Sequence, residues 1–177
     1  RKENPGIGEF RTPDTWFITS DALIDFINYN SLEDFRSFKF SRIEEIQHNY
    51  PYLVQVCTQS VFSPEMQSQL KLILDDMGER PLIVRSSSLL EDSTGTSFSG
   101  KYRSLFLANI GTKDERLAAL SEAIAEVYAS IFNPDAIQYR AERGLLDYYE
   151  EMGVLIQHVI GKRVGRYFFP AFAGVAF

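Results

Sequence analysis

The feature that most constrains the fold of this chain is a segment of small and hydroxyl residues enclosed by two apolar runs. Residues 82–84, Leu-Ile-Val, are the kind of short apolar run that forms a buried strand, and Arg85 follows them directly. Residues 93–100 are serine, threonine and glycine except for Phe98, and residues 102–108 are rich in aromatic and aliphatic side chains. The pattern predicts a strand that ends at Arg85, a loop, and a returning strand.

The composition of this loop suits phosphate binding. Backbone N–H groups and hydroxyls can surround phosphate oxygens, and glycine allows close approach because it has no Cβ. Arg85 would add a planar fork of donors that matches phosphate geometry. Loops of this composition are usually plain surface connections, however, and Arg85 could instead pair with Glu91 or Asp92. On these residues alone, both interpretations stay open.

Composition argues against several classes of protein. The chain has 177 residues, of which 45% are hydrophobic, enough to bury the core of one domain or of two small lobes. Its net charge of −6 argues against a nucleic-acid partner, because the phosphate backbone requires basic patches. No apolar run approaches membrane-spanning length and no signal peptide is recognisable, so we expect no membrane partner and a cytoplasmic location.

The single cysteine and the two ends of the chain carry further expectations. Cys57 cannot form a disulfide within the chain, and its apolar surroundings predict a buried thiol in a protein of a reducing compartment. The chain begins at Arg1 and ends within the apolar run 172–177. We therefore expect it to be a fragment of a longer polypeptide.

Hydrophobic periodicity divides the chain into a mostly helical part, residues 1–80, and a strand-rich part, residues 81–177. We expect one α+β domain, with helices packed on a mainly antiparallel sheet. The expected strands are 15–19, 82–85, 102–108, 153–160 and one or two within 167–177, with a basic turn at 161–166. One expected helix follows Ser20 as a cap, and two short helices lie between Ser31 and Tyr50, the second ended by Pro51. Further helices are expected to begin at Pro64 and to span 114–131 and 134–143.

Two polar residues in the apolar run 153–160 need an explanation. Gln157 would leave its amide unsatisfied without partners, which costs on the order of 1–3 kcal/mol, and from the residues alone we expect the backbone to satisfy it. His158 should point to the opposite face of the strand. Neither His158 nor His48 has a metal-binding residue at ligand spacing, so a zinc site and a histidine nucleophile have no support.

The order of residues in the loop resembles a known signature. VRSSSLLED…SFSGKYRS is similar to VRSSxxxED…SFAGxxxT of the nucleotide-binding domain shared by phosphoenolpyruvate synthase and pyruvate phosphate dikinase. Four further segments resemble that family: 12–22 (PxGFxITTxA), 133–144 (NxRAxxYRxxxG), 152–159 (MAVLVQxM) and 173–177 (SGVAFT). Nearly the whole chain is covered, most weakly at residues 26–59.

This resemblance implies a partial ATP-grasp domain, spanning residues 1–177, that binds Mg-ATP. In the family, a phosphoryl group passes from ATP to a histidine on another domain and then to pyruvate, and some homologues phosphorylate other acceptors. The matching positions imply ATP-binding roles for Arg85, Gly100, Ser104 and Gln157, and a weaker one for Lys101. The Mg²⁺ ligands and the carrier histidine are expected outside this chain, so no catalytic residue is expected within it.

The loop departs from the family at three positions. Ser93 and Thr94 replace the usual Leu-Pro, and Ser99 replaces alanine. These changes leave two alternatives open: an active phosphotransferase, or a non-catalytic or regulatory nucleotide-binding module of the same fold. Residues 89–99 have few apolar anchors, so we expect them to be mobile without nucleotide.

Overall fold

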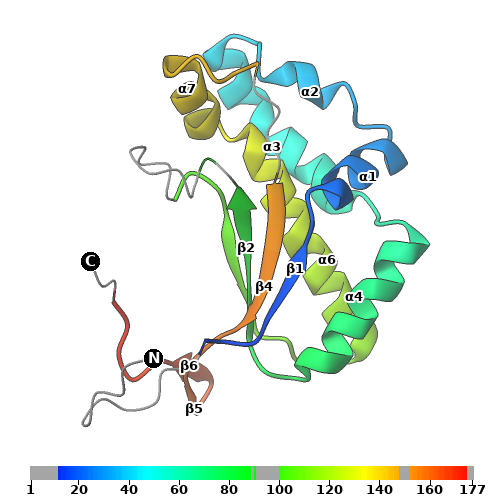
Figure 1. The fold of residues 1–177 in the computed structure, drawn as a ribbon, viewed down its shortest axis with the longest axis vertical. Helices are drawn as coiled ribbons and strands as arrows, with labels where there is room; N and C mark the ends of the chain where they lie inside the picture. The colour runs from blue at the N-terminus through cyan, green and yellow to red at the C-terminus, as the bar shows by residue number, and fades with distance from the viewer. Residues whose placement is uncertain (1–11, 89, 91–99, 148–151, 175–177) are drawn as a thin grey trace, which may run out of the picture.

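A four-stranded antiparallel sheet carries the helices of the chain on one of its faces (Figure 1). The computed structural model describes residues 12–88, 90, 100–147 and 152–174. The strands are β1 Thr15–Ile18, β2 Leu82–Ser88, β3 Ser104–Leu107 and β4 Met152–His158, in the order β1-β4-β2-β3. The expected α+β class with an antiparallel sheet is confirmed.

The pairing of β2 with β3 confirms that residues 82–85 and 102–108 belong to one sheet. Leu82 lies opposite Leu107, and Arg85 lies opposite Ser104. However, β2 continues three residues past Arg85, because β4 pairs with it along its whole length as far as Ser88. The prediction that the strand ends at Arg85 is therefore wrong.

The helices are α1 Asp21–Tyr29, α2 Phe35–Phe38, α3 Ile43–Gln59, α4 Pro64–Met77, α6 Lys113–Ala129 and α7 Pro134–Glu142, with a 3₁₀ turn, η1, at Ser130–Phe132. Two starts follow the expected chemistry. The Ser63 side chain accepts a hydrogen bond from the Met66 N–H, and the Asn133 side chain accepts one from the Asp135 N–H. Ser20 precedes α1, but its side chain makes no capping hydrogen bond, so that expectation is wrong.

Pro51 lies inside α3 and does not end it, contrary to the sequence prediction. Proline lacks an N–H, so the helix loses the hydrogen bond to the carbonyl of Gln47, one turn earlier. Both Gln47 and Pro51 are exposed, so water can reach that carbonyl. The buried side of the helix, which carries Ile46, Leu53 and Cys57, continues through this position.

The core lies between the helices and the sheet face that they cover. Alternate residues of β2 and β4 enter it, among them Leu82, Val84 and Ile156. On α4, Leu70, Ile73, Leu74 and Met77 are buried in this core, and Met66 is partly buried. Ser86 and Ser88 also face the helices, and both are buried there.

Asn109 connects the end of α4 to the start of α6. Its backbone is in the left-handed region, with φ +55°, and the residue is only 7% exposed. Its amide nitrogen donates to the carbonyls of Gly78 and Arg80, each at 2.8 Å. Its amide oxygen accepts from Nε of Arg116 on α6, also at 2.8 Å. Hydrogen bonds from one side chain therefore join the end of α4 to α6, two helices that are not adjacent in sequence.

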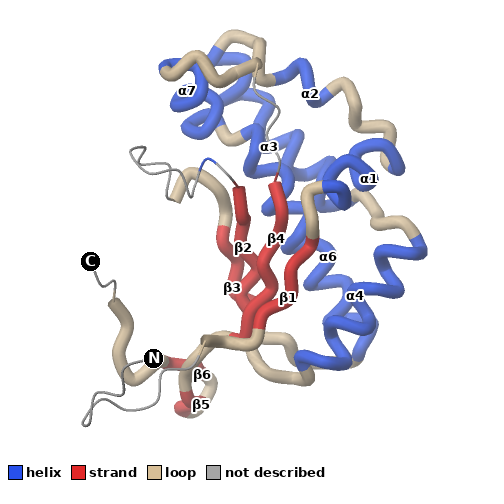
Figure 2. Tube along the Cα trace, viewed as in Figure 1, coloured by secondary structure: helices blue, strands red, loops and turns tan. Residues whose placement is uncertain are grey.

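Residues 162–169 form a separate hairpin beyond β4, and do not add strands to the main sheet (Figure 2). β5, Lys162–Val164, pairs with β6, Tyr167–Phe169. The basic segment expected to be a turn therefore contains a strand, and the expected closing strand pairs only with it. Within the described residues, none of the helices has the length and apolar character needed to span a bilayer.

Candidate functional site

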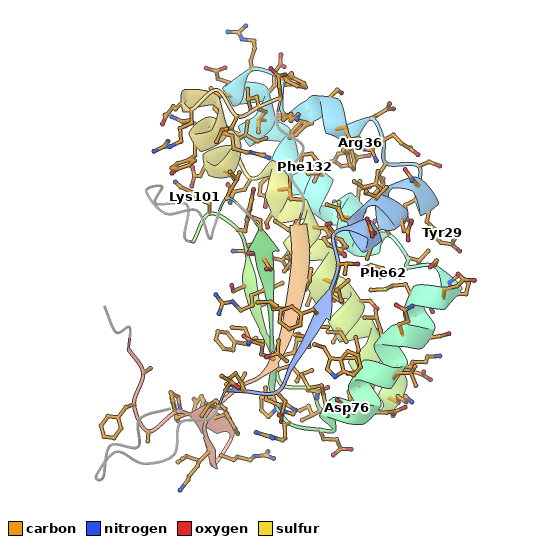
Figure 3. The ribbon with its side chains drawn as sticks, in the orientation of Figure 1. Tyr29, Arg36, Phe62, Asp76, Lys101 and Phe132 are labelled. Carbon is orange, nitrogen blue, oxygen red and sulfur yellow. The ribbon has the colours of Figure 1, made fainter. Side chains whose placement is uncertain are left out.

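The second face of the sheet is not covered by any described helix, and it brings together residues from all four strands (Figure 2). We call it the open face. Residues directly opposite in an antiparallel sheet share a face, so the register assigns its members in two rows. One row is Phe17, Leu155, Arg85 and Ser104; the other is Thr15, Gln157, Ile83 and Phe106. Side chains project from it in Figure 3, away from the helices.

Arg85 occupies an exposed position on an inner strand of the open face. It lies opposite Leu155 on one side and Ser104 on the other. Among the described residues, no carboxylate forms an ion pair with Arg85. The alternative partners Glu91 and Asp92, like the whole segment 91–99, lie outside the described residues. Arg85 thus lies in the middle of β2, on an exposed sheet surface, and not at the end of the strand.

Ser104 begins β3 and is exposed beside Arg85. Directly opposite residues of antiparallel strands hold their Cβ atoms about 4.5–5.5 Å apart. The Arg85 guanidinium and the Ser104 hydroxyl can therefore act on the same group. The structure brings these two expected site residues together.

Gln157 lies in the neighbouring row of the open face, opposite Ile83 on β2. Strand spacing and rise place its Cα roughly 8 Å from that of Arg85, one strand across and two residues along. Its amide nitrogen donates to the Thr15 hydroxyl at 2.9 Å, and that hydroxyl donates to the Pro13 carbonyl at 3.0 Å. We expected the backbone to satisfy this amide. The partner is instead a side chain on β1, the Thr15 hydroxyl.

Gly100 and Lys101 lie away from the two rows. Gly100 is an exposed turn residue with φ +81°, and a Cβ there would meet nothing within 4 Å, so the turn alone accounts for the glycine. The Lys101 ammonium lies 5.7 Å from the ring centroid of Tyr139 on α7. Figure 3 shows Lys101 beside that helix. The structure does not bring either residue into the cluster formed by Arg85, Ser104 and Gln157.

The histidines do not belong to the open face. His158 is buried on the helix-covered side, as expected from strand alternation; its Nε2 lies 2.8 Å from the Met77 carbonyl and its Nδ1 lies 3.2 Å from the Asp14 carboxylate. His48 is exposed in the interior of α3. Across the described ranges, no group of three or more His, Cys, Asp or Glu side chains is placed to hold a metal ion.

The large electrostatic shifts lie in the helical layer. Burial raises the pKa of the Cys57 thiol to about 12 and that of the Tyr50 hydroxyl to about 12. Cys57 is 4% exposed, which confirms the expected buried thiol. These shifts result from packing and do not mark a reactive group, because an inaccessible neutral thiol is inert.

Three residues of the open face were not predicted from the sequence to belong to the site. Phe17 and Phe106 are aromatic side chains that are 69% and 71% exposed, on the two edge strands. Thr15 was seen only as the start of a strand. Alternation within each strand could have placed the two phenylalanines on one face, but the pairing of Thr15 with Gln157 joins residues 142 positions apart and has no local signal.

The open face thus carries an arginine, a hydroxyl, an amide and aromatic side chains, and comparison with known proteins shows the family of the chain. The chain belongs to the family described as "Pyruvate phosphate dikinase, AMP/ATP-binding domain", which it matches over residues 5–177. The resemblance seen in the sequence is thereby confirmed.

Two curated relatives extend this comparison. Phosphoenolpyruvate synthase of Aquifex aeolicus is 22% identical over 166 residues, which cover 88% of this chain and 19% of the relative. The uncharacterized phosphotransferase YvkC of Bacillus subtilis is 28% identical over 150 residues, which cover 84% of this chain and 16% of the relative. The chain thus spans less than a fifth of the length of these relatives.

Proposed function

We propose that residues 1–177 are the ATP-binding part of an ATP-grasp phosphotransferase, and that the nucleotide lies on the open face. The observation that carries this proposal is the register of the sheet. It places Arg85 opposite Ser104, with Gln157 one strand away in the next row. The family description, which includes AMP and ATP binding, supports an adenine nucleotide as the ligand.

Each group on the open face has a role in this proposal. The Arg85 guanidinium binds phosphate oxygens through two directed N–H donors, and the Ser104 hydroxyl donates to the same group. The exposed ring of Phe106 and the neighbouring Ile83, which lie in the same row as Gln157, offer apolar surface for the planar base. Gln157 contacts the polar edge of the base. Gly100 and Lys101 follow the expected phosphate loop directly in the sequence, and their proposed role is to contact the phosphates.

The proposed reaction extends beyond this chain. ATP would donate a phosphoryl group to a carrier histidine on another domain, and the carrier would pass it to pyruvate or another acceptor. The name of the Aquifex relative, a phosphoenolpyruvate synthase, supports pyruvate chemistry in the family. In such transfers the protein mainly positions the phosphates and neutralises their charge. Arg85 would supply that charge here, and we assign no Mg²⁺ ligand to this chain.

Substitution of Arg85 tests the binding proposal. In the complete natural polypeptide that contains residues 1–177, Arg85→Ala should weaken ATP binding roughly ten- to hundredfold, because a charge-assisted hydrogen bond contributes on the order of 1.5–3 kcal/mol. Arg85→Lys should recover only part of the affinity, since lysine keeps the charge but loses the planar fork. Isothermal titration calorimetry measures both. Arg36→Ala is the matched control, because Arg36 is an exposed arginine on α2 in the helical layer (Figure 3).

Thermal melts separate binding from stability. If Arg85 serves only the fold, Arg85→Ala lowers the melting temperature and leaves the ATP dissociation constant within about twofold of the wild-type value; that outcome would defeat the proposed site. A phosphohistidine assay with labelled ATP tests the transfer step separately. ATP binding without any phosphohistidine would favour the regulatory module over the phosphotransferase.

A further inference from the structure

The amide of Gln157 is held in one orientation by a chain of hydrogen bonds to β1. The Pro13 carbonyl can only accept a hydrogen bond, so the Thr15 hydroxyl must use its single proton to donate to it at 3.0 Å. The remaining lone pairs of that hydroxyl can only accept. The group that lies 2.9 Å away must therefore be the donor, the amide nitrogen of Gln157. The Pro13 carbonyl and the Thr15 hydroxyl thus fix the orientation of the Gln157 amide, with its nitrogen towards Thr15.

The orientation of the amide leaves its oxygen as the free end. Oε1 of Gln157 makes no hydrogen bond with any residue in the part of the chain that the structure describes. The side chain belongs to the open face and is only partly buried, so a ligand there can reach it. Thr15 and Gln157 are directly opposite in the register, so the contact is built into the pairing of β1 with β4. The open face therefore presents a fixed hydrogen-bond acceptor.

We propose that Thr15 is a positioning residue that makes this site selective for a base with an exocyclic amino group. With the amide held by Thr15, Oε1 accepts from the amino group of adenine. A purine with a 6-oxo group would place two acceptors against each other, which is unfavourable. This inference rests on the proposed nucleotide site and adds the basis of its selectivity. Thr15 acts through Gln157 and contacts no phosphate.

A purely structural role for Thr15 makes a different prediction. If the Thr15–Gln157 contact only joins β1 to β4, its loss lowers the affinity for every ligand of the open face by a similar factor. If it orients the amide, its loss lets the amide turn, so that Nε2 can donate to a 6-oxo group. Binding of adenine and of 6-oxopurine nucleotides would then change in opposite directions.

The experiment compares ATP with ITP, which carries a 6-oxo group in place of the amino group. Calorimetry on the complete natural polypeptide should show wild-type protein binding ATP at least about tenfold more tightly than ITP. Thr15→Val, which keeps the shape of the side chain and removes the hydroxyl, should weaken ATP binding and strengthen ITP binding. The ratio of the two affinities should then fall below about threefold. Thr15→Ser, which restores the hydroxyl, should restore the ratio. Tripolyphosphate affinity should be unchanged in both variants.

The outcomes distinguish the two proposals. Equal binding of ATP and ITP by the wild type, a parallel loss of both in Thr15→Val, or a Thr15→Ser variant that behaves like Thr15→Val would overturn the role of Thr15 and leave the nucleotide site standing. Absence of ATP binding to the wild type would overturn both the site and the inference. A reciprocal change in ATP and ITP affinity, restored by serine, is the result expected.

Discussion

Replacing Asn109 tests whether the junction of α4 and α6 stabilises the fold that holds the sheet in place. The side chain makes three hydrogen bonds, all at 2.8 Å, and one of them involves the charged guanidinium of Arg116. A neutral hydrogen bond contributes about 0.5–1.5 kcal/mol and one to a charged group about 1.5–3 kcal/mol. Alanine at φ +55° adds about 1 kcal/mol of backbone strain.

These contributions give an expected loss of about 3.5–7 kcal/mol in the free energy of unfolding for Asn109→Ala. Asn109→Gly loses the same hydrogen bonds but tolerates the left-handed backbone, so it should be about 1 kcal/mol more stable than Asn109→Ala. Asn109→Asp keeps an acceptor for Arg116 but turns a second oxygen towards the carbonyls of Gly78 and Arg80, so it should also destabilise the protein.

Urea unfolding of the 177-residue chain, followed by the fluorescence of Trp16, its only tryptophan, measures these differences. Asn49→Ala is the control, because Asn49 is exposed on α3; its effect should stay within about 0.5 kcal/mol. A loss below about 1 kcal/mol for Asn109→Ala would refute the additive argument. A glycine variant no more stable than the alanine variant would refute the contribution of backbone strain.

Two further predictions concern stability. Burial raises the pKa of the Cys57 thiol from its ordinary value of 9.0 to about 12, so the unfolded chain loses this proton at lower pH than the folded protein does. The free energy of unfolding should therefore fall as pH rises from 9 towards 12. Urea unfolding of Cys57→Ala should show a shallower fall over the same pH range. Gly153→Ala would place a Cβ 2.9 Å from the Ile18 carbonyl oxygen, and should cost about 1–3 kcal/mol in urea unfolding, whereas Gly174→Ala, whose Cβ meets nothing within 4 Å, should be neutral; equal effects would contradict the close contact.

The parts of the fold that follow from neighbouring residues were predictable. Ser63 with Pro64 and Asn133 with Pro134 mark helix starts through chemistry that lies within four residues. The pairing of residues 82–85 with 102–108 followed from two apolar runs joined by a loop. Arg85 and Ser104 lie on these two strands, and the register, which places them directly opposite each other, was not predicted from the sequence.

The parts that depend on distant pairing were not predictable. The three serines after Arg85 are not among the β-branched and aromatic residues that favour strands, yet β4 holds them in the sheet, so Arg85 is a mid-strand residue. The partner of Gln157 comes from β1, more than a hundred residues earlier. Pro51 shows the converse case: a strong local signal was overridden because the lost hydrogen bond falls on the exposed side of α3.

The position of β4 between β1 and β2 has a consequence for folding during synthesis. β1 emerges from the ribosome among the first described residues, but its only partner in the described sheet is β4, which ends at His158. The helices and the β2–β3 pair depend on contacts closer in sequence, and can form earlier. The edge of β2 that receives β4 stays unpaired until translation has passed residue 158, so the nascent chain carries two unfilled strand edges during this interval. Chaperone binding to the nascent chain should therefore be strongest before β4 emerges, and should decline once it has paired.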